Sequence, residues 1–327
     1  MCTIVVWAAD GIADVSARNM DWFEDMGTDL WVFPRGIRRT GLPAGDGNPL
    51  CWTSRYGSIA ASVYGIATAD GVNEAGLGMH MLWLDESDYG SRDASLPGLC
   101  VSLWGQFFLD GFATVAEAVL YANDHPFQVV TTSFSSAAYA ATVHLQIEDS
   151  LGDIAVFEYV DGNLHVFHNR SYRVMTNSPV FEKQIENLKQ YKGFGGTADL
   201  PGTSDAADRF VRAAYYMQHL RKPDSVLEAV AGAISVARNV AQPFVDLSRP
   251  HADTSPTLWR TVIDHANLAY YFESTMSPYL TWIDASAFSF AEGSPVMRLP
   301  LSNDIWDYAG DSSDRLVPSE PFAWAMP

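Results

Sequence analysis

The first 90 positions of the chain alternate short apolar runs with turn residues, a pattern typical of antiparallel strands. Residues 3–9 and 13–19 are two such runs, and the Asp10-Gly11 dipeptide between them favours a tight hairpin turn. This hairpin would fold the second run back along the first, so that residues 15–21 lie beside position 2. Further strands are expected at residues 30–34, 58–64 and 77–84, the last after a turn-like segment at residues 70–76.

Helical patterns follow, because apolar residues recur at intervals of three and four. Helices are predicted at residues 98–109 and 115–122, the second beginning at Thr114 with Glu117 in a capping box. Strands resume at residues 144–148, 153–159, 164–168 and 173–176, with a hairpin turn at Asp161-Gly162. Helices are then expected at residues 180–190, 206–220 and 226–241, followed by a Pro-rich loop at 243–256 and strands at 258–263, 268–272 and 279–284.

The order of these elements predicts an α+β fold. Strands and helices come in blocks rather than in regular alternation, so neither a Rossmann fold nor a (β/α) barrel is expected. A four-layer αββα sandwich, with two antiparallel sheets between two helical layers, fits the order. We see no internal repeat, low-complexity tract or linker, so residues 1–327 are predicted to form one domain.

Composition and charge exclude several classes of protein. A hydrophobic fraction of 48% and a charged fraction of 18% exclude intrinsic disorder. The 39 acidic and 20 basic residues give a net charge of −19, which repels phosphate, so no nucleic-acid partner is expected. Two stretches without charged side chains, residues 94–109 and 126–147, are broken by Pro and Gly or rich in polar residues, so no membrane span is predicted.

The cysteines and histidines predict neither a disulfide framework nor a metal site. Cys2, Cys51 and Cys100 cannot all pair within one chain and form no CxxC motif; the last two are interpreted as small buried apolar residues. His165 and His168 are three positions apart on an expected strand, where that spacing directs them to opposite faces. No metal ion and no cofactor are expected.

Cys2 is different, because removal of Met1 would leave a chain that begins with a thiol. The terminal residue would then carry a nucleophile and a basic α-amine together, an arrangement whose Ser and Thr counterparts act as catalytic nucleophiles. The hairpin would bring Arg18 and Asp21 within reach. A guanidinium beside a thiol favours the thiolate, and a carboxylate could hold the amine. The plainer alternatives are a chance position for Cys2 and a surface Arg–Asp pair worth about 0–1 kcal/mol.

Several motifs occur in an order that resembles one known family. They are Met1-Cys2-Thr3, Arg-Asn-Met-Asp-Trp at 18–22, Leu-Trp-Val-Phe-Pro-Arg-Gly at 30–36, Asp-Gly-Val-Asn-Glu-Ala-Gly-Leu at 70–77, Met-Thr-Asn-Ser-Pro at 175–179 and Arg-Phe-Val-Arg at 209–212. Together they resemble the choloylglycine hydrolases, N-terminal-nucleophile amidases that include penicillin V acylases and conjugated bile-salt hydrolases. The resemblance covers nearly the whole chain, is closer to the Gram-negative branch, and implies the αββα fold.

The resemblance also implies a role for each of five residues. It makes Cys2 the nucleophile with its freed amine as base, Arg18 the arginine beside the thiol, Asp21 the carboxylate that positions the amine, Asn177 an oxyanion donor through its side-chain amide, and Arg209 a second supporting arginine. Arg212, one helical turn further on, remains an alternative to Arg209.

The chain departs from the family pattern at Trp83, where many relatives carry a second asparagine. The implied donor at this position is a backbone N–H, which Trp83 also possesses. Trp22 and Trp83 are expected to flank the nucleophile as an apolar clamp for an aromatic or acyl side chain, with ordinary core packing as the alternative.

The substrate is expected to be a small N-acyl amide. Penicillin V or an N-acyl homoserine lactone suits a narrow two-tryptophan clamp, and conjugated bile salts, which need a wider apolar bowl, are the alternative. A catalytically silent binding module of the same fold is the alternative from a different class. The resemblance further implies a homotetramer. A cytoplasmic location is expected if Met1 is the natural start, and export if a signal cleavage exposes Cys2.

Overall fold

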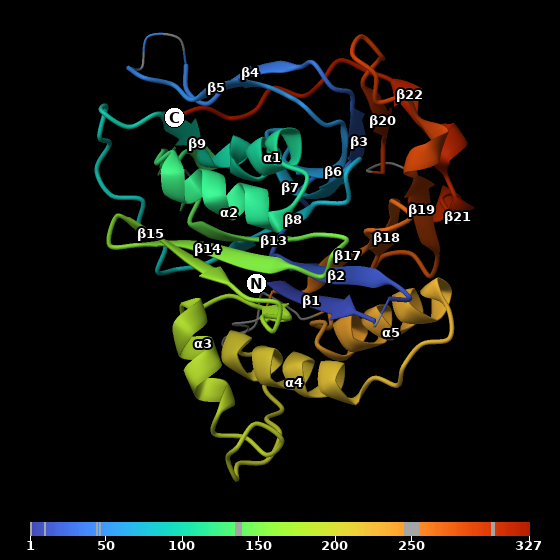
Figure 1. Cartoon of the computed structure of the whole chain (residues 1–327). Coiled ribbons are helices and arrows are strands. Elements are labelled where there is room, and N and C mark those ends of the chain that lie inside the picture. Colours follow the sequence, from blue (N-terminus) through green and yellow to red (C-terminus); the bar gives the residue numbers. More distant parts are fainter. Residues whose placement is uncertain are drawn as a thin grey trace.

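A computed structural model describes residues 2–9, 11–43, 45, 47–134, 139–244, 255–301 and 305–327. Within these residues, two large sheets lie face to face at the centre of the molecule (Figure 1). Sheet I has seven described strands, in the order β16 (Val174–Met175), β1 (Cys2–Ala8), β2 (Asp14–Asp21), β17 (Thr257–Asp264), β18 (Ala269–Ser274), β19 (Leu280–Asp284) and β21 (Gly310–Asp311).

Sheet II has nine described strands, in the order β15 (Asn163–His168), β14 (Ile154–Val160), β13 (Val143–Glu148), β8 (Gly78–Trp83), β7 (Ala67–Asn73), β6 (Ser58–Val63), β3 (Leu30–Phe33), β20 (Met297–Leu299) and β22 (Val317–Pro318). Neighbouring strands of both sheets pair antiparallel, apart from the parallel pair β19 and β21 at an edge of sheet I.

Helices cover the outer faces of both sheets (Figure 1). Sheet II is covered by α1 (Val101–Gly111) and α2 (Val115–Asp124), and sheet I by α4 (Ala206–His219) and α5 (Val226–Asn239), with α3 (Phe181–Leu188) packed beside α4. The resulting four-layer αββα sandwich confirms the predicted fold class.

Short elements connect the layers. The described ones are β4 (Arg38–Thr40), β5 (Cys51–Thr53), β9 (Gly98–Cys100), β10 (Gln128–Val130), β11 (Ser133–Phe134), β12 (Tyr139–Ala140) and the 3₁₀ turns η1 (Ala285–Ala287), η2 (Ile305–Asp307) and η3 (Ser313–Arg315).

The apolar core lies in two main layers. One cluster fills the space between the sheets and beneath α4 and α5, and the other lies beneath α1 and α2. Strands β1 and β2 are buried on both faces because helices cover one face and sheet II covers the other. This explains why Cys2–Ala8 is an almost continuous apolar run rather than an alternating one.

The two predicted hairpins are confirmed. Strands β1 and β2 pair with Cys2 opposite Met20, although Asp10 of the expected turn lies outside the described residues. In the second hairpin, Asp161 and Gly162 have φ values of 49° and 74°, the left-handed conformations that a two-residue type I′ turn requires.

The prediction of a turn-like segment at residues 70–76 is wrong for its first half. Ala67–Asn73 forms the central strand β7, and the turn comes only after Asn73. Polar residues such as Asp70 suggested a loop, but their partners lie inside the sandwich. Gly71 allows close strand packing, since a Cβ there would lie 2.6 Å from the carbonyl oxygen of Ile59.

Two further predictions need correction. The helix expected at 98–109 begins only at Val101, because Gly98–Cys100 pairs in parallel with β10. Cys51 is exposed on β5 rather than buried, whereas Cys100 is fully buried. Residues 245–254 of the expected Pro-rich loop lie outside the described residues.

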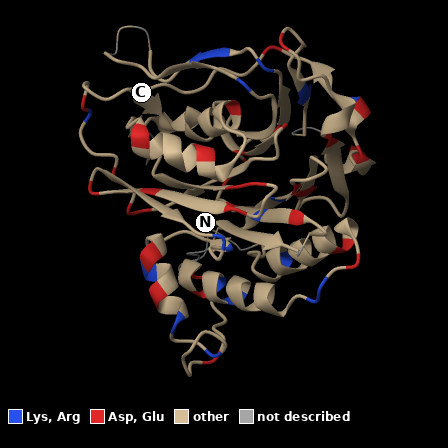
Figure 2. Cartoon of the chain, viewed as in Figure 1, with Lys and Arg blue, Asp and Glu red and all other residues tan. Residues whose placement is uncertain are grey.

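In Figure 2 the acidic residues are spread over helices of both helical layers and over loops. Among the described residues, no helix combines the length and the hydropathy that a membrane crossing requires.

Candidate active site

The pairing of β1 with β2 brings Arg18 to the thiol of Cys2. Cys2 lies opposite Met20 and Ile4 opposite Arg18, so the side chains of Cys2, Arg18 and Met20 share the face of sheet I that looks toward sheet II. Nη2 of Arg18 lies 3.7 Å from Sγ of Cys2. Cys2 is only 3% exposed and Arg18 is fully buried, so solvent screens this contact little.

The guanidinium of Arg18 is fixed by acceptors from sheet II. Nη2 donates to the carbonyl oxygen of Met81 at 2.9 Å, and Nη1 donates to the carbonyl oxygen of Ala69 at 3.2 Å and to Oδ2 of Asp70 at 3.4 Å. Burial lowers the pKa of Arg18, but its interactions with Cys2 and with the negative charge of Asp70 outweigh it and raise the pKa overall. The guanidinium therefore stays charged beside the thiol.

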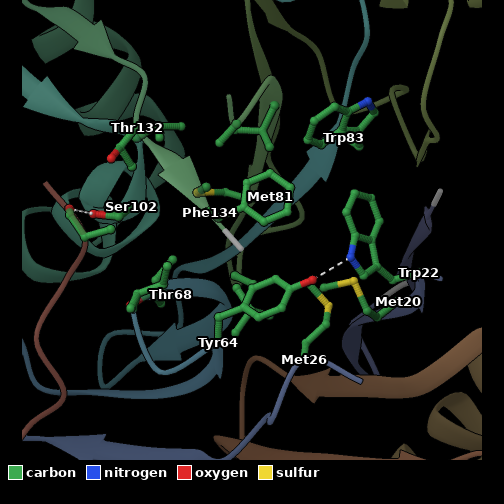
Figure 3. A pocket seen from close by; sticks show the side chains of 18 of the residues that line it. Met20, Trp22, Met26, Tyr64, Thr68, Met81, Trp83, Ser102, Thr132 and Phe134 are labelled. Atoms are coloured by element: carbon green, nitrogen blue, oxygen red, sulfur yellow. Dashed lines mark hydrogen bonds between the residues drawn. The ribbon is translucent and has the colours of Figure 1, made fainter. Parts of the chain in front are cut away.

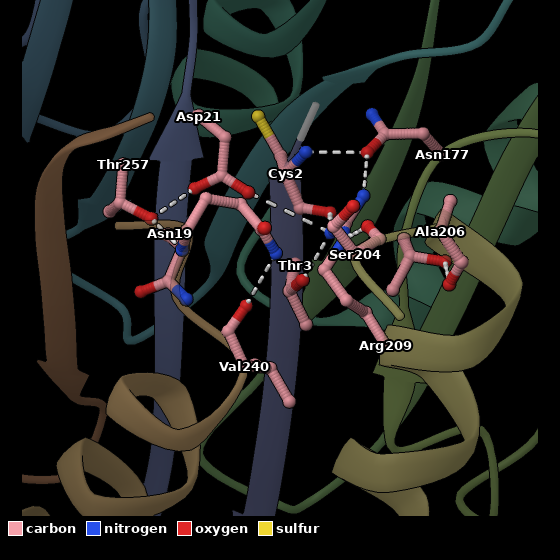
Figure 4. Close-up of polar contacts among 12 residues, drawn as sticks. Cys2, Thr3, Asn19, Asp21, Asn177, Ser204, Ala206, Arg209, Val240 and Thr257 are labelled. Carbon is pink, nitrogen blue, oxygen red and sulfur yellow. Dashed lines mark hydrogen bonds and ion pairs between the residues drawn. The ribbon is translucent and has the colours of Figure 1, made fainter. Parts of the chain in front are cut away.

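The opposite face of the same hairpin looks toward the helices and carries Asp21. Its Oδ1 accepts a hydrogen bond from the hydroxyl of Thr257 at 2.6 Å, and its Oδ2 lies 3.8 Å from Nη1 of Arg209 (Figure 4). Burial raises the pKa of this carboxyl, against the opposing effect of Arg209. Strand alternation thus places Arg18 on the thiol side of Cys2 and Asp21 on the helix side.

Arg209, on α4, reaches the backbone of the N-terminal strand. Its Nη1 donates to the carbonyl oxygen of Cys2 and to Oγ1 of Thr3, both at 2.5 Å, and its Nη2 donates to Oδ1 of Asn177 at 2.9 Å. Arg212 instead donates to the carbonyl oxygen of Thr203 at 2.6 Å. Of the two candidate arginines, Arg209 is the one beside Cys2.

Asn177 follows β16, the strand that pairs with the outer edge of β1, and this places its side chain beside Cys2. Its Oδ1 accepts from the backbone nitrogen of Cys2 at 2.5 Å and from Arg209 (Figure 4). Its Nδ2 donates to the carbonyl oxygen of Trp83 at 2.7 Å. A guanidinium can only donate, so the atom facing Arg209 must be the amide oxygen.

The backbone of Trp83 also faces the site. The backbone N–H of Leu84 donates to the carbonyl oxygen of Thr142 on β13. Hydrogen-bonded and non-hydrogen-bonded pairs alternate along an antiparallel ladder, so the adjacent pair of Trp83 and Val143 is not hydrogen-bonded. The N–H and C=O of Trp83 therefore point away from β13. The pairing of β7 with β8 reaches only as far as His80. The edge of β8 therefore presents the N–H of Trp83 on the side where Asn177 binds its carbonyl.

Cys2 is one of the residues that line an apolar pocket of about 720 Å³, including its open mouth. Figure 3 shows the side chains around this pocket. The ring centroids of Trp22 and Trp83 are 5.5 Å apart, and Phe134 lies 5.9 Å and 6.0 Å from them. The indole N–H of Trp22 donates to the hydroxyl of Tyr64 at 2.7 Å, which holds the ring in place. Ala325 also lines the pocket, and its carbonyl oxygen accepts from the Ser102 hydroxyl at 2.7 Å.

The structure brings together all the site residues predicted from the sequence: Cys2, Arg18, Asp21, Asn177 and Arg209 around the N-terminal strand, and Trp22 and Trp83 in the pocket. Sequence reasoning missed Tyr64, Phe134 and Ala325, because no local pattern marks residues that line a pocket from distant elements. It also missed Asp70, although a buried arginine needs a nearby anion. Among the described residues, no group of three or more His, Cys, Asp or Glu side chains is arranged to hold a metal ion.

Residues 2–292 match the family described as linear amide C–N hydrolases, choloylglycine hydrolase family. A penicillin V acylase from Pectobacterium atrosepticum is 40% identical over 334 aligned residues, which cover 95% of this chain and 88% of that protein. A bile salt hydrolase/transferase from Clostridium perfringens is 26% identical over 278 residues, covering 74% of this chain and 79% of that protein.

The fold matches solved structures over its whole length. The penicillin V acylase from Agrobacterium tumefaciens superposes with a TM-score of 0.90 at 42% identity, covering 100% of both chains. A mutant conjugated bile acid hydrolase from Clostridium perfringens superposes with a TM-score of 0.77 at 23% identity, covering 91% of this chain and 96% of that one, a likeness of fold. The chain is therefore a hydrolase of linear amides and belongs to the choloylglycine hydrolase family.

Proposed function

We propose that this protein is a penicillin V acylase-like amidase that cleaves small N-acyl amides through a thioester on Cys2. The observation that carries the proposal is the position of the Cys2 thiol, 3.7 Å from the buried guanidinium of Arg18 at the base of an aromatic pocket. A thiolate is the reactive form of cysteine, and a fixed cation beside it in a dry site favours that form.

The first half of the reaction forms the thioester. The thiol proton passes to the α-amine of Cys2, and the thiolate attacks the amide carbonyl. The second N–H of the Asn177 side chain and the backbone N–H of Trp83 donate to the oxyanion. As the intermediate collapses, the C–N bond breaks and the protonated α-amine gives its proton to the leaving amine.

The second half releases the acid. The α-amine, now neutral, takes a proton from water, and the hydroxide attacks the thioester carbonyl. The C–S bond then breaks, and the proton returns to the thiolate. This scheme requires that Met1 has been removed. Two contacts would hold the terminal residue at both ends: Asn177 Oδ1 lies 2.5 Å from the nitrogen of Cys2, and Arg209 donates to the carbonyl oxygen of Cys2. The carboxylate of Asp21 would balance the positive charge of Arg209.

The pocket favours an aromatic acyl group over a steroid. Trp22, Trp83 and Phe134 lie within 6.0 Å of one another by ring centroid, so they pack together into one aromatic wall on which a flat ring can lie. The phenoxyacetyl group of penicillin V carries such a ring. An N-acyl homoserine lactone offers a flexible chain to the same walls, and a glycine- or taurine-conjugated bile salt is the second candidate because relatives with that name share the family.

A hydrolysis panel tests the substrate. Released amine is measured with penicillin V, a long-chain N-acyl homoserine lactone, glycocholate and taurocholate at equal concentrations. We expect the highest kcat/KM for penicillin V. Faster cleavage of glycocholate or taurocholate would establish the bile-salt hydrolase instead, and no turnover of any of the four would favour a silent binding module.

Trp22→Leu is expected to lower kcat/KM for penicillin V by about tenfold, chiefly through a higher KM. The change removes one aromatic wall of the pocket, and a ring contact between that wall and the acyl group is worth about 0.5–1.5 kcal/mol. Steady-state kinetics measure the effect. The matched control is Trp306→Leu, since Trp306 is 60% exposed and outside the described lining of the pocket. Equal kcat/KM values for Trp22→Leu and the wild type would remove Trp22 from the substrate site.

A further inference from the structure

A continuous chain of buried polar side chains runs behind Arg18, between the two sheets. Its members are at most 1% exposed and come from both sheets and from the residue after β17; they are Ser16, Asp70, His80, Glu148, His265 and Tyr270. All six lie outside the described residues that line the pocket. The reaction scheme above gives them no role, and burying so many ionisable groups is costly unless each is paired.

Asp70 is the link between this chain and Arg18. Its Oδ2 accepts from Nη1 of Arg18 at 3.4 Å and from Nδ1 of His80 at 2.5 Å, and its Oδ1 accepts from the hydroxyl of Tyr270 at 2.6 Å. Three donors, one each from β2, β8 and β18, therefore hold the carboxylate of Asp70. Asp70 in turn binds Nη1 of Arg18, whereas Nη2 of the same guanidinium faces the thiol of Cys2.

His80 continues the chain. Its Nε2 lies 2.7 Å from Oε1 of Glu148, which lies 3.4 Å from Nε2 of His265. Ser16 Oγ lies 3.2 Å from Nε2 of His80 and 2.9 Å from Nε2 of His265. His265 is anchored through its Nδ1, 3.0 Å from the carbonyl oxygen of Gly76. The imidazole of His80 is thus clamped between two carboxylates.

The charges along this chain alternate. Burial opposes ionisation of His80, but Glu148 and Asp70 raise its pKa to about 10, so the ring is charged at neutral pH. Burial raises the pKa of Asp70, but His80 and Arg18 lower it overall, and Asp70 remains a carboxylate. Positive and negative groups therefore alternate along the row Arg18, Asp70, His80 and Glu148. Each buried charge is balanced only while its neighbours stay in place.

We propose that Asp70 is a positioning residue for the amidase: it orients Arg18 so that Nη2 faces Cys2 Sγ, and His80 and Tyr270 hold Asp70 in that role. This inference rests on the proposed function of Cys2. Asp70 is 0% exposed and contacts Arg18 rather than Cys2, so it would act on the thiolate only through the guanidinium.

Asp70→Asn is expected to lower kcat by about 10²-fold, the scale of a misplaced catalytic group, with little change in KM. The matched control is Asp110→Asn. Asp110 is another buried carboxylate bound to an arginine, with its Oδ2 2.7 Å from Nε of Arg39, but it belongs to helix α1 and does not contact Arg18. A general loss of stability would affect both variants, whereas loss of Arg18 positioning lowers kcat only in the first.

The thiol itself provides a readout that needs no substrate. Cys2 and Cys51 are alkylated with iodoacetamide across a pH series and quantified by peptide mass spectrometry, the exposed Cys51 serving as the reference within each molecule. The other charged groups at Cys2, which are Arg209 and Asp21, are unchanged in the variant. We expect Asp70→Asn to slow alkylation of Cys2 at neutral pH by about tenfold or more, and to leave Cys51 unchanged.

The sign of the change distinguishes positioning from a simple charge effect. Removing a nearby negative charge while Arg18 stays in place would favour the thiolate, so wild-type or faster alkylation of Cys2 would overturn the proposal. In an Arg18→Met background, Asp70→Asn should have no additional effect on Cys2, because the residue through which it acts is absent. A full additional effect in that background would also contradict the proposal.

Tyr270→Phe covers the case in which Asp70→Asn fails to fold. It removes the hydroxyl that donates to Oδ1 of Asp70 and leaves every charge in place, so we expect slower Cys2 alkylation by at least about twofold. An unchanged rate would count against the proposal. If the wild type hydrolyses none of the four test substrates but alkylation of Cys2 still depends on Asp70, the proposed function fails while the positioning of Arg18 stands.

Discussion

Cys2→Ser is expected to reduce amide hydrolysis by at least about 10³-fold while leaving the fold intact. Serine replaces the sulfur with a smaller oxygen and adds no atom at a position that is 3% exposed, so packing in β1 changes little. A hydroxyl is far harder to ionise than a thiol, and Arg18, at 3.7 Å from the sulfur, cannot compensate for that difference. Amine release from penicillin V measures the loss of hydrolysis, and thermal melting measures whether the fold stays intact.

Cys51→Ser is the matched control, because Cys51 is exposed on β5, outside the described lining of the pocket. Its activity should equal that of the wild type. Intact mass of the active wild-type protein should show that Met1 is absent, since the α-amine of Cys2 is the proposed base. Full activity of Cys2→Ser, or a fully active protein that retains Met1, would contradict the mechanism.

Asn177→Ala is expected to lower kcat by about 10²–10³-fold, the usual effect of removing one oxyanion donor. The side chain also accepts from the nitrogen of Cys2 and from Arg209, so its loss removes the contact that fixes the proposed base. The backbone should keep its position, because Gln184 donates to the carbonyl oxygen of Asn177 at 3.0 Å. Single-turnover kinetics separate acylation, where we expect the larger defect, from hydrolysis of the thioester.

Asn73→Ala is the control for this variant. Asn73 is also a buried asparagine, and its Nδ2 donates to the carbonyl oxygens of Leu109 and Phe112, outside the described residues of the pocket. It should lower the free energy of unfolding without changing kcat of the folded protein. Wild-type turnover by Asn177→Ala would exclude Asn177 from the reaction.

Local patterns predicted most of the secondary structure. The Asp161-Gly162 turn and the Thr114 cap of α2 were readable because each depends on a few neighbouring residues; the hydroxyl of Thr114 accepts from the amide of Glu117, as a capping box requires. Strand β7 could not be predicted from local pattern, because its polar residues are typical of a loop. Their hydrogen-bond partners come from sheet I and α1, which are distant in the chain. The same is true of Gly98–Cys100, whose partner strand lies 30 residues further along the chain.

The site was predicted to an unequal degree. Cys2, Arg18 and Asp21 could be grouped from the hairpin, since the chain folds back over a single turn. The choice between Arg209 and Arg212 could not be made from sequence, because both lie on α4 and only the packing of that helix on β1 decides which one reaches Cys2. The tetramer implied by family resemblance stays a prediction, as does the single-domain organisation.

The sequence by itself determined the order of most elements, the fold class and the family, and it pointed to Cys2 as the candidate nucleophile, because turns, caps, periodicity and motifs depend on residues that are close in the chain. The tertiary structure decided which side chains face the thiol, which aromatic rings form the pocket, and why Asp70 lies behind Arg18. Most of those contacts join residues far apart in the chain, such as Arg18 with Asp70, 52 positions apart, and Asp70 with Tyr270, 200 positions apart, and they exist only once two sheets and their helices have packed together.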